Sequence, residues 1–200
     1  MPWPEPISLR GYHVTLVPLA QRHCQELIEA VKDGDLYKLW YTSIPAPENM
    51  AQTIAERVKQ REAGLLLPFA VIGNATDKVV GMTNYLNVDA VNRRVEIGGT
   101  WYRKSVQRSG VNTEAKLLLL QHEFETLDCI AVELRTHFFN HQSRHAIERI
   151  GAKLDGILRS HQFSANGTLR DTCVYSVIAS EWPTVKALLT WQLTRPRADA

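Results

Sequence analysis

Apolar and polar residues alternate along several short stretches of the chain, which is the pattern of strands with one buried face. Turn-forming residues at Gly73, Asn74 and Asn92 separate three of these stretches in the middle of the chain, which predicts an antiparallel meander there. Helical patterns separate the strands only in the second half, so a mixed sheet is expected. Strands are predicted at positions 12–17, 67–72, 79–88, 95–102, 130–138, 153–160 and 171–178.

Helical spacing of apolar residues predicts the remaining elements. The pattern is clearest where Leu117, Leu120, Phe124 and Leu127 share one face. In contrast, positions 36–50 are rich in aromatic residues and proline and are expected to form an irregular loop that contributes to a pocket. Helices are predicted at 19–31, 51–63, 111–127 and 140–150, with a last helix opened by Ser180 and Pro183.

Length and composition restrict the class of protein. The chain has 200 residues, 44% hydrophobic residues and a formal net charge of +2, which fits one folded domain and disfavours a nucleic-acid binder. Neither a membrane span nor a secretory signal is predicted, so the protein is expected to be cytoplasmic and free of membrane. Cys24, Cys129 and Cys173 are too few and too far apart for a disulfide framework.

Two features of the pattern suggest a ligand site. Gly98 and Gly99 interrupt a predicted strand, which usually marks a bulge or a close approach by another backbone or a ligand. Residues 107–112 then connect this strand to the long helix, so backbone N–H groups at the helix N-terminus are placed to bind phosphate. The alternative is an ordinary turn in which Ser109 or Asn112 caps the helix.

Taken together, these segments resemble the GNAT acetyltransferases. The resemblance is carried by residues 95–101, the loop that begins at Gln107, the helix start at residues 112–116, residues 140–144 and residues 148–152. It extends over about 8–181 and is closest to the branch that acetylates N-terminal amines of ribosomal proteins. The sequence departs from the family loop at Arg108 and Asn112.

The resemblance implies a fold and a reaction. The fold would be a single α/β domain over 1–200, with a core of about 8–181 and a C-terminal helix over 181–193. Its mostly antiparallel, mixed central sheet would be splayed in the middle, with helices on both faces. The reaction would be direct transfer of an acetyl group from acetyl-CoA to a primary amine in a ternary complex, without a metal. A catalytically weak or inactive acyl-CoA-binding module is the alternative.

The resemblance also assigns roles to residues. Glu96 would accept a proton from the amine, unless it is a surface glutamate paired with Arg93 or Arg94. Ser143 would protonate the departing thiolate, unless it and Asn140 serve only the start of a helix. The residues expected to bind acetyl-CoA are Trp101, Tyr102, Gln107, Arg108, Ser109, Gly110, Val111, Asn112, Thr113 and Asn140.

The acceptor is less restricted by the sequence. Trp40 and Tyr41 are expected to contact the amine substrate, although aromatic residues at this density are more often part of a core. The acceptor could be a protein N-terminus or a small-molecule amine, and the chain a monomer or a homodimer. His137, His141 and His145 recur every four residues, but they fall on a strand and a helix, so a zinc site is not expected.

Overall fold

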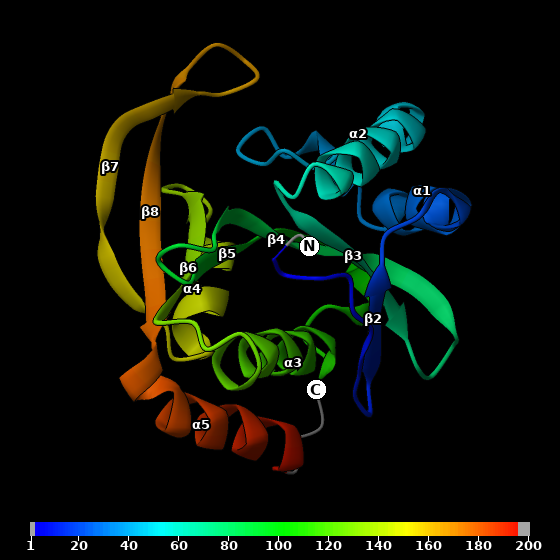
Figure 1. Cartoon of the computed structure of the whole chain (residues 1–200). Helices are drawn as coiled ribbons and strands as arrows, with labels where there is room; N and C mark the ends of the chain where they lie inside the picture. Colours follow the sequence, from blue (N-terminus) through cyan, green and yellow to red (C-terminus); the bar gives the residue numbers. More distant parts are fainter. Residues whose placement is uncertain (1–2, 196–200) are drawn as a thin grey trace.

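The computed structural model describes residues 3–195 and contains one mixed sheet of eight strands (Figure 1). The strand order is β1-β2-β3-β4-β5-β6-β8-β7, and only the β5–β6 pair is parallel. The expected mixed, mostly antiparallel sheet is therefore confirmed. The strands are β1 (Leu9–Arg10), β2 (Val14–Pro18), β3 (Leu67–Gly73), β4 (Lys78–Asp89), β5 (Arg94–Tyr102), β6 (Ala131–His137), β7 (Lys153–Phe163) and β8 (Leu169–Ile178).

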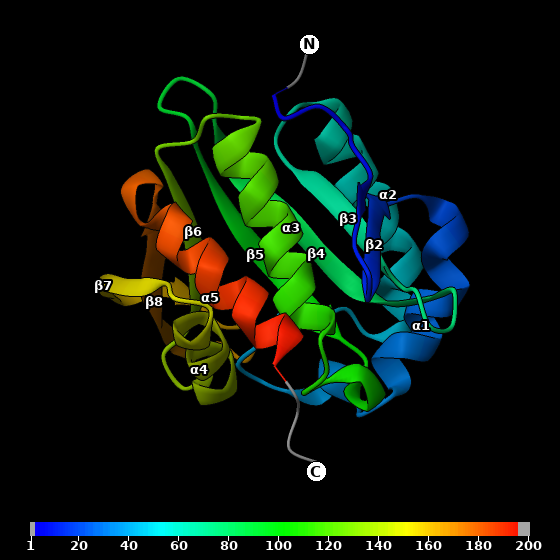
Figure 2. The ribbon, with the colours of Figure 1, turned by 90° about the horizontal axis from the view of Figure 1, so that it is seen from below.

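Helices cover both faces of the sheet, as expected (Figures 1 and 2). On one face, Leu27 and Ile54 pack with Met82 of β4. On the other face, Leu119 packs with Tyr85 and Tyr175. The helices are α1 (Cys24–Lys32), α2 (Met50–Glu62), α3 (Val111–Glu125), α4 (His141–Arg149) and α5 (Trp182–Thr194). The first face is covered by α1 and α2, and the second by α3 and α5.

One helix boundary and one short strand differ from the sequence predictions. A 3-10 turn, Gln21–His23, precedes α1, so this helix begins later than its apolar pattern indicated. The irregular segment 36–50 contains two further 3-10 turns, Leu36–Lys38 and Pro47–Asn49, which fits its proline content. The short strand β1 was not predicted, because two residues show no alternation.

The sheet opens between β5 and β6. These strands are paired only at Arg94–Ala131, Val95–Val132 and Glu96–Glu133. Beyond Glu96 the two strands diverge, although both continue for several residues. The expected splay in the middle of the sheet is therefore present, and it exposes one edge of β5 to a gap.

A β-bulge lies on β5 beside this gap. Met82 pairs with Trp101, and Asn84 pairs with Gly98. Gly99 and Thr100 of β5 therefore lie opposite a single residue of β4, Thr83. Gly99 has a φ of +57°, in the left-handed region that favours glycine. The bulge predicted from the paired glycines is confirmed.

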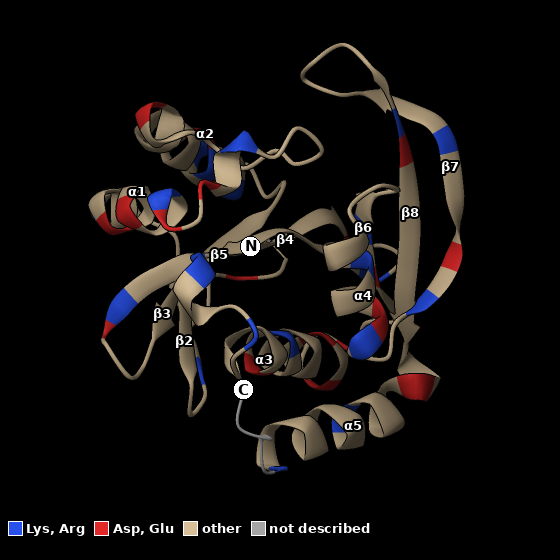
Figure 3. Cartoon of the chain, turned by 180° about the vertical axis from the view of Figure 1, so that it is seen from behind, with Lys and Arg blue, Asp and Glu red and all other residues tan. Residues whose placement is uncertain are grey.

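Charged residues of both signs are interspersed along the ribbon (Figure 3). This distribution agrees with the small net charge of the whole chain. Among the helices in residues 3–195, none combines the length and the apolar character needed to cross a membrane.

Candidate active site

A cavity of about 1560 Å³ occupies the gap between β5 and β6. Its wall includes parts of α2, α3, α4, β5, β6 and β8, together with the loop before α2 and the loop before α3. Trp40, Gly110 and Val111 are absent from the described wall. The cavity brings together most of the residues predicted from the sequence: Tyr41, Glu96, Trp101, Tyr102, Gln107, Arg108, Ser109, Asn112, Thr113, Asn140 and Ser143.

The cavity has two sides because it passes through the sheet. Met82 and Trp101 pack against α1 and α2, and the strand period of two places Asn84, Gly98 and Glu96 on the same face. The opposite face of β5 packs against α3, whose N-terminus also lines the cavity. A bound molecule could therefore extend from the helix N-terminus through the gap to the glutamate.

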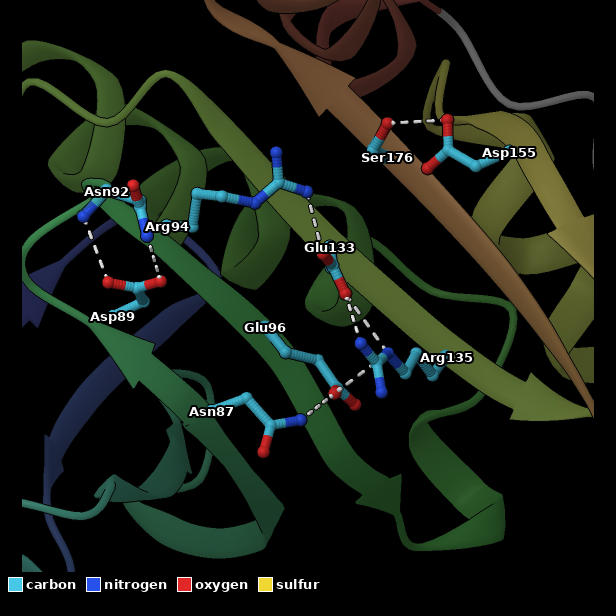
Figure 4. A network of polar contacts seen from close by, with 9 residues as sticks. All are labelled: Asn87, Asp89, Asn92, Arg94, Glu96, Glu133, Arg135, Asp155 and Ser176. Atoms are coloured by element: carbon cyan, nitrogen blue, oxygen red, sulfur yellow. Dashed lines mark hydrogen bonds and ion pairs between the residues drawn. The ribbon is translucent and has the colours of Figure 1, made fainter. Parts of the chain in front are cut away.

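Glu96 is buried and points into the gap (Figure 4). Its Oε2 atom accepts a 2.7 Å hydrogen bond from Asn87 Nδ2 and lies 3.5 Å from Arg135 Nε. Burial raises the pKa of this carboxyl, while Arg135 and Asn87 oppose the increase. The alternative of a surface glutamate paired with Arg93 or Arg94 is wrong.

Arg135 lies between two carboxylates, those of Glu96 and Glu133 (Figure 4). Glu133 accepts a 2.7 Å hydrogen bond from Arg135 Nη2 and another of 2.7 Å from Arg94 Nη2. Burial opposes ionisation of Glu133, but these hydrogen bonds and charges lower its pKa overall. Glu133 is thus the stronger partner of Arg135, which leaves Glu96 able to take up a proton.

The loop before α3 is held by hydrogen bonds to the end of β5 and within itself. Gln107 Nε2 donates to the Tyr102 carbonyl over 2.9 Å, and Ser109 Oγ donates to the Val106 carbonyl over 2.5 Å. Arg108 is exposed and adopts a φ of +59°. Ser109 Oγ also accepts from Val111 N over 3.3 Å, but no side chain caps α3 at Gly110. Asn112 therefore does not cap this helix.

Gly110 is required for a structural reason. A Cβ atom at this position would lie 2.6 Å from His13 Cδ2. The hairpin that carries His13 is fixed to α3 by Glu114, whose carboxylate accepts hydrogen bonds from the backbone N–H groups of Tyr12, His13 and Val14. The close approach of this hairpin accounts for the glycine without reference to a ligand.

Asn140 caps α4, because its Oδ1 atom accepts a 3.0 Å hydrogen bond from Ser143 N. The capping alternative is therefore correct for Asn140, and its expected role in cofactor binding remains a prediction. The side chain of Ser143 contributes to the cavity wall.

Arg149 was not among the predicted site residues, although it lies in one of the segments that carried the resemblance. Arg149 Nη2 donates to Thr113 Oγ1 over 3.1 Å, and Nη1 donates to Gln192 Oε1 over 2.6 Å. This arginine joins the start of α3 to α5 at the cavity wall.

Lys116 was likewise not predicted as a site residue, although it too lies in a segment that carried the resemblance. Its Nζ atom is buried and donates a 2.8 Å hydrogen bond to Thr100 Oγ1 in the bulge. Burial lowers the pKa of Lys116 to about 7, although Glu123 opposes this shift.

Of the two aromatic residues expected to contact the amine, Tyr41 lies in the cavity wall and Trp40 lies beside Tyr41, outside that wall. Trp40 is 49% exposed, and its ring centroid is 5.2 Å from that of His137. Tyr41 lines the cavity, and its ring centroid is 5.6 Å from that of Trp40. The core alternative does not apply to Trp40.

The histidine and cysteine side chains of the described residues are candidate metal ligands and nucleophiles. Residues 3–195 hold no group of three or more His, Cys, Asp or Glu side chains arranged to bind a metal ion. His137 Nδ1 instead accepts a 3.1 Å hydrogen bond from Phe139 N. Cys129 and Cys173 are buried free thiols, whereas Cys24 is a half-buried free thiol.

Comparison with known proteins places the chain in a family. Residues 13–153 match the family model described as "Acetyltransferase (GNAT) domain". The chain is 34% identical over 121 residues to the Bacillus subtilis protein "Putative ribosomal N-acetyltransferase YdaF". This match covers 60% of the chain but only 61% of that protein, which is less than two thirds of its length.

Solved structures extend the likeness to nearly the whole chain. A GCN5-related N-acetyltransferase from Brucella melitensis has 34% identity and a TM-score of 0.86, with 96% of this chain and 88% of that chain covered. An acetyltransferase structure from T. thermophilus, whose name marks the activity as putative, has 31% identity and a TM-score of 0.83, with 96% and 99% covered. The fold expected from the sequence is confirmed, and the chain belongs to the GNAT acetyltransferase family.

Proposed function

We propose that this protein transfers an acetyl group from acetyl-CoA directly to a primary amine held in the same cavity. The observation that carries this proposal is the position of the buried Glu96 carboxylate on one face of the splayed sheet, opposite the α3 N-terminus on the other. The whole chain would act as one catalytic unit, because residues beyond the family match, including Arg170 and Gln192, also line the cavity.

The α3 side of the cavity suits the cofactor. The first N–H groups of a helix attract anions, and Arg108, Arg149 and Arg195 add positive charge at the same wall. The diverging edge of β5 offers backbone groups that could pair with the pantetheine amides. Two proteins of the same fold are named as complexes with this cofactor: the microcin C7 self immunity acetyltransferase MccE with acetyl-CoA and AMP, and RimL with coenzyme A, each at a TM-score of 0.74.

The chemical step requires an unprotonated amine. Glu96 accepts a proton from the amine, either directly or through water, as the nitrogen forms a bond to the thioester carbonyl carbon. Backbone N–H groups at the bulge stabilise the negative charge on the carbonyl oxygen. The carbon–sulfur bond then breaks, Ser143 donates its hydroxyl proton to the sulfur, and water carries the proton from Glu96 back to Ser143. The products are an N-acetylated amine and free coenzyme A.

Calorimetric titration with acetyl-CoA and with coenzyme A tests the cofactor site. Gly110 is a poor position for a variant, since any side chain there meets His13. Asn112→Asp is better, because an acidic residue in the first helical turn should not harm the fold but should repel the cofactor phosphates. We expect affinity to fall about tenfold or more, equivalent to about 1.4 kcal/mol.

Asn49→Asp is the matched control, because it makes the same change at the exposed start of α2, outside the described cavity wall. It should leave the affinity unchanged. A wild-type protein that binds neither cofactor would overturn the proposed function. Binding without thiol release from acetyl-CoA in the presence of any primary amine would instead support the alternative of a binding module.

A further inference from the structure

The charge of the cavity differs from that of the whole chain. Within its described wall, Glu96 is the only residue with a carboxylate. The basic residues in this wall are Arg57, Arg108, Lys116, Arg135, Arg149, Arg170 and Arg195. The arginines on the α3 side suit cofactor phosphates, and Arg135 is paired with Glu96 and Glu133. Arg57 and Arg170 lie outside both of these groups.

Arg57 reaches the cavity from α2. Its Nη1 atom donates a 2.8 Å hydrogen bond to Asn84 Oδ1, whereas its buried Nε atom has no hydrogen-bond partner. In the part of the chain that the structure describes, no carboxylate lies within 4.0 Å of this guanidinium. Arg57 is half-buried and its Nε atom is fully buried, and a cation in such a place calls for a counter-ion.

Arg57 is held at the bulge. Asn84, which accepts its hydrogen bond, donates in turn from Nδ2 to the Gly98 carbonyl over 2.9 Å. A Cβ atom built on Gly99 would lie 3.6 Å from Arg57 Nη2, and one built on Gly98 would lie 2.7 Å from Glu96 Oε1. The guanidinium and the Glu96 carboxylate therefore flank the same glycine pair without forming an ion pair with each other.

We propose that the acceptor is an amine that carries a carboxylate a few bonds away, with its nitrogen at Glu96 and its carboxylate at Arg57. The planar guanidinium can donate two parallel hydrogen bonds to such a group. Arg170 supplies further positive charge on this side of the sheet, where its Nε atom donates to Thr172 Oγ1 over 3.2 Å. This inference rests on the proposed function, since it assumes that the amine is the acetyl acceptor.

The test compares matched ligands that differ only in charge. L-amino acids and their amides are titrated into protein saturated with coenzyme A. A second pair, the C-terminal amides of Ser-Glu-Ala and Ser-Gln-Ala, distinguishes a free amino acid from an acidic peptide end. At least one carboxylate ligand should bind about tenfold more tightly than its neutral partner. Arg57→Gln should abolish this difference, and Arg57→Lys should retain only part of it.

Lys59→Gln is the control, because it removes the same charge from an exposed position of α2 outside the described cavity wall. It should preserve the preference for the carboxylate. Equal binding of charged and neutral partners, no binding of either, or equal effects of the two glutamine variants would overturn this proposal. Melting temperature and acetyl-CoA affinity verify that Arg57→Gln is folded. Thiol release with any amine separately decides the proposed function.

Discussion

Lys116 Nζ donates a 2.8 Å hydrogen bond to Thr100 Oγ1, so a lysine from the second turn of α3 is bound to the bulge of β5. Thr100 Oγ1 is in turn 2.7 Å from Thr83 Oγ1 on the neighbouring strand. The hydrogen bonds of this buried amine therefore go to hydroxyl groups. Burial of this amine lowers the pKa of Lys116 to about 7, and Glu123 opposes the shift only in part.

Lys116 should make the stability of the fold depend on pH. Between about pH 7 and 10.5 the unfolded lysine binds a proton that the folded one does not. The free energy of unfolding should therefore rise with pH across this window, at up to about 1.4 kcal/mol per pH unit. Urea denaturation of wild type and Lys116→Met from pH 6 to 10 measures this, and the variant should lose the slope. Parallel curves for the two proteins would show that Lys116 stays charged in the fold.

Glu123 should destabilise the fold at neutral pH. Both of its carboxyl oxygens are buried without a hydrogen-bond partner, and burial raises its pKa well above the ordinary value. Stability is therefore lost as pH rises from about 4.5 toward the folded pKa, because the unfolded carboxyl ionises first. Glu123→Met should stabilise the protein by about 1–3 kcal/mol at pH 7. Glu29→Met, at an exposed site on α1, should change stability by less than about 0.5 kcal/mol.

Arg135 should set the pH at which Glu96 becomes active. Arg135 opposes the increase in pKa that burial imposes on Glu96. Arg135→Met should therefore move the acidic limb of the kcat/KM profile to higher pH, provided that Glu96 is the base. Arg94→Met is the control, because Arg94 contacts Glu133 and not Glu96. Glu96 would be ruled out as the titrating group if the acidic limb of the kcat/KM profile kept its pH in Arg135→Met. The same conclusion would follow if the limb were still present in Glu96→Gln.

The sequence predicted those features that depend on near neighbours. Alternation located the central strands, and the Gly98–Gly99 pair located the bulge. The sequence did not predict which basic residue pairs with Glu96. Arg94 shares a face with Glu96 and was the obvious candidate, but Arg135 reaches the same carboxylate through the parallel pairing of β5 and β6. Such pairing joins segments far apart in the chain, so it cannot be predicted from the spacing of neighbouring residues.

The basic character of the cavity could not be predicted either. The net charge of +2 sums over the whole surface, where acidic residues offset the basic ones. Arg57, Lys116, Arg149 and Arg170 come from three helices and one strand, and each alone has the spacing of an ordinary surface residue. Only the divergence of β5 from β6 gives these side chains a common cavity to face.

Gly99→Ala should harm both stability and activity. A residue with a side chain at a φ of +57° is strained, and the added Cβ would lie 2.6 Å from Asn84 Nδ2. We expect a loss of about 1–3 kcal/mol in the free energy of unfolding. Displacement of Asn84 should also release Arg57, so activity should fall at temperatures where the variant is fully folded.

Gly156→Ala is the matched control for this change, because a Cβ atom there meets nothing within 4 Å. It lies in β7, and its stability should stay within about 0.5 kcal/mol of wild type. Urea denaturation compares the two variants, and thiol release at about 20 °C below each melting temperature compares their activities. Equal stabilities would mean that the bulge relaxes around a side chain. A stable but inactive Gly99→Ala would instead mean that the glycine serves the chemistry of the cavity more than the fold.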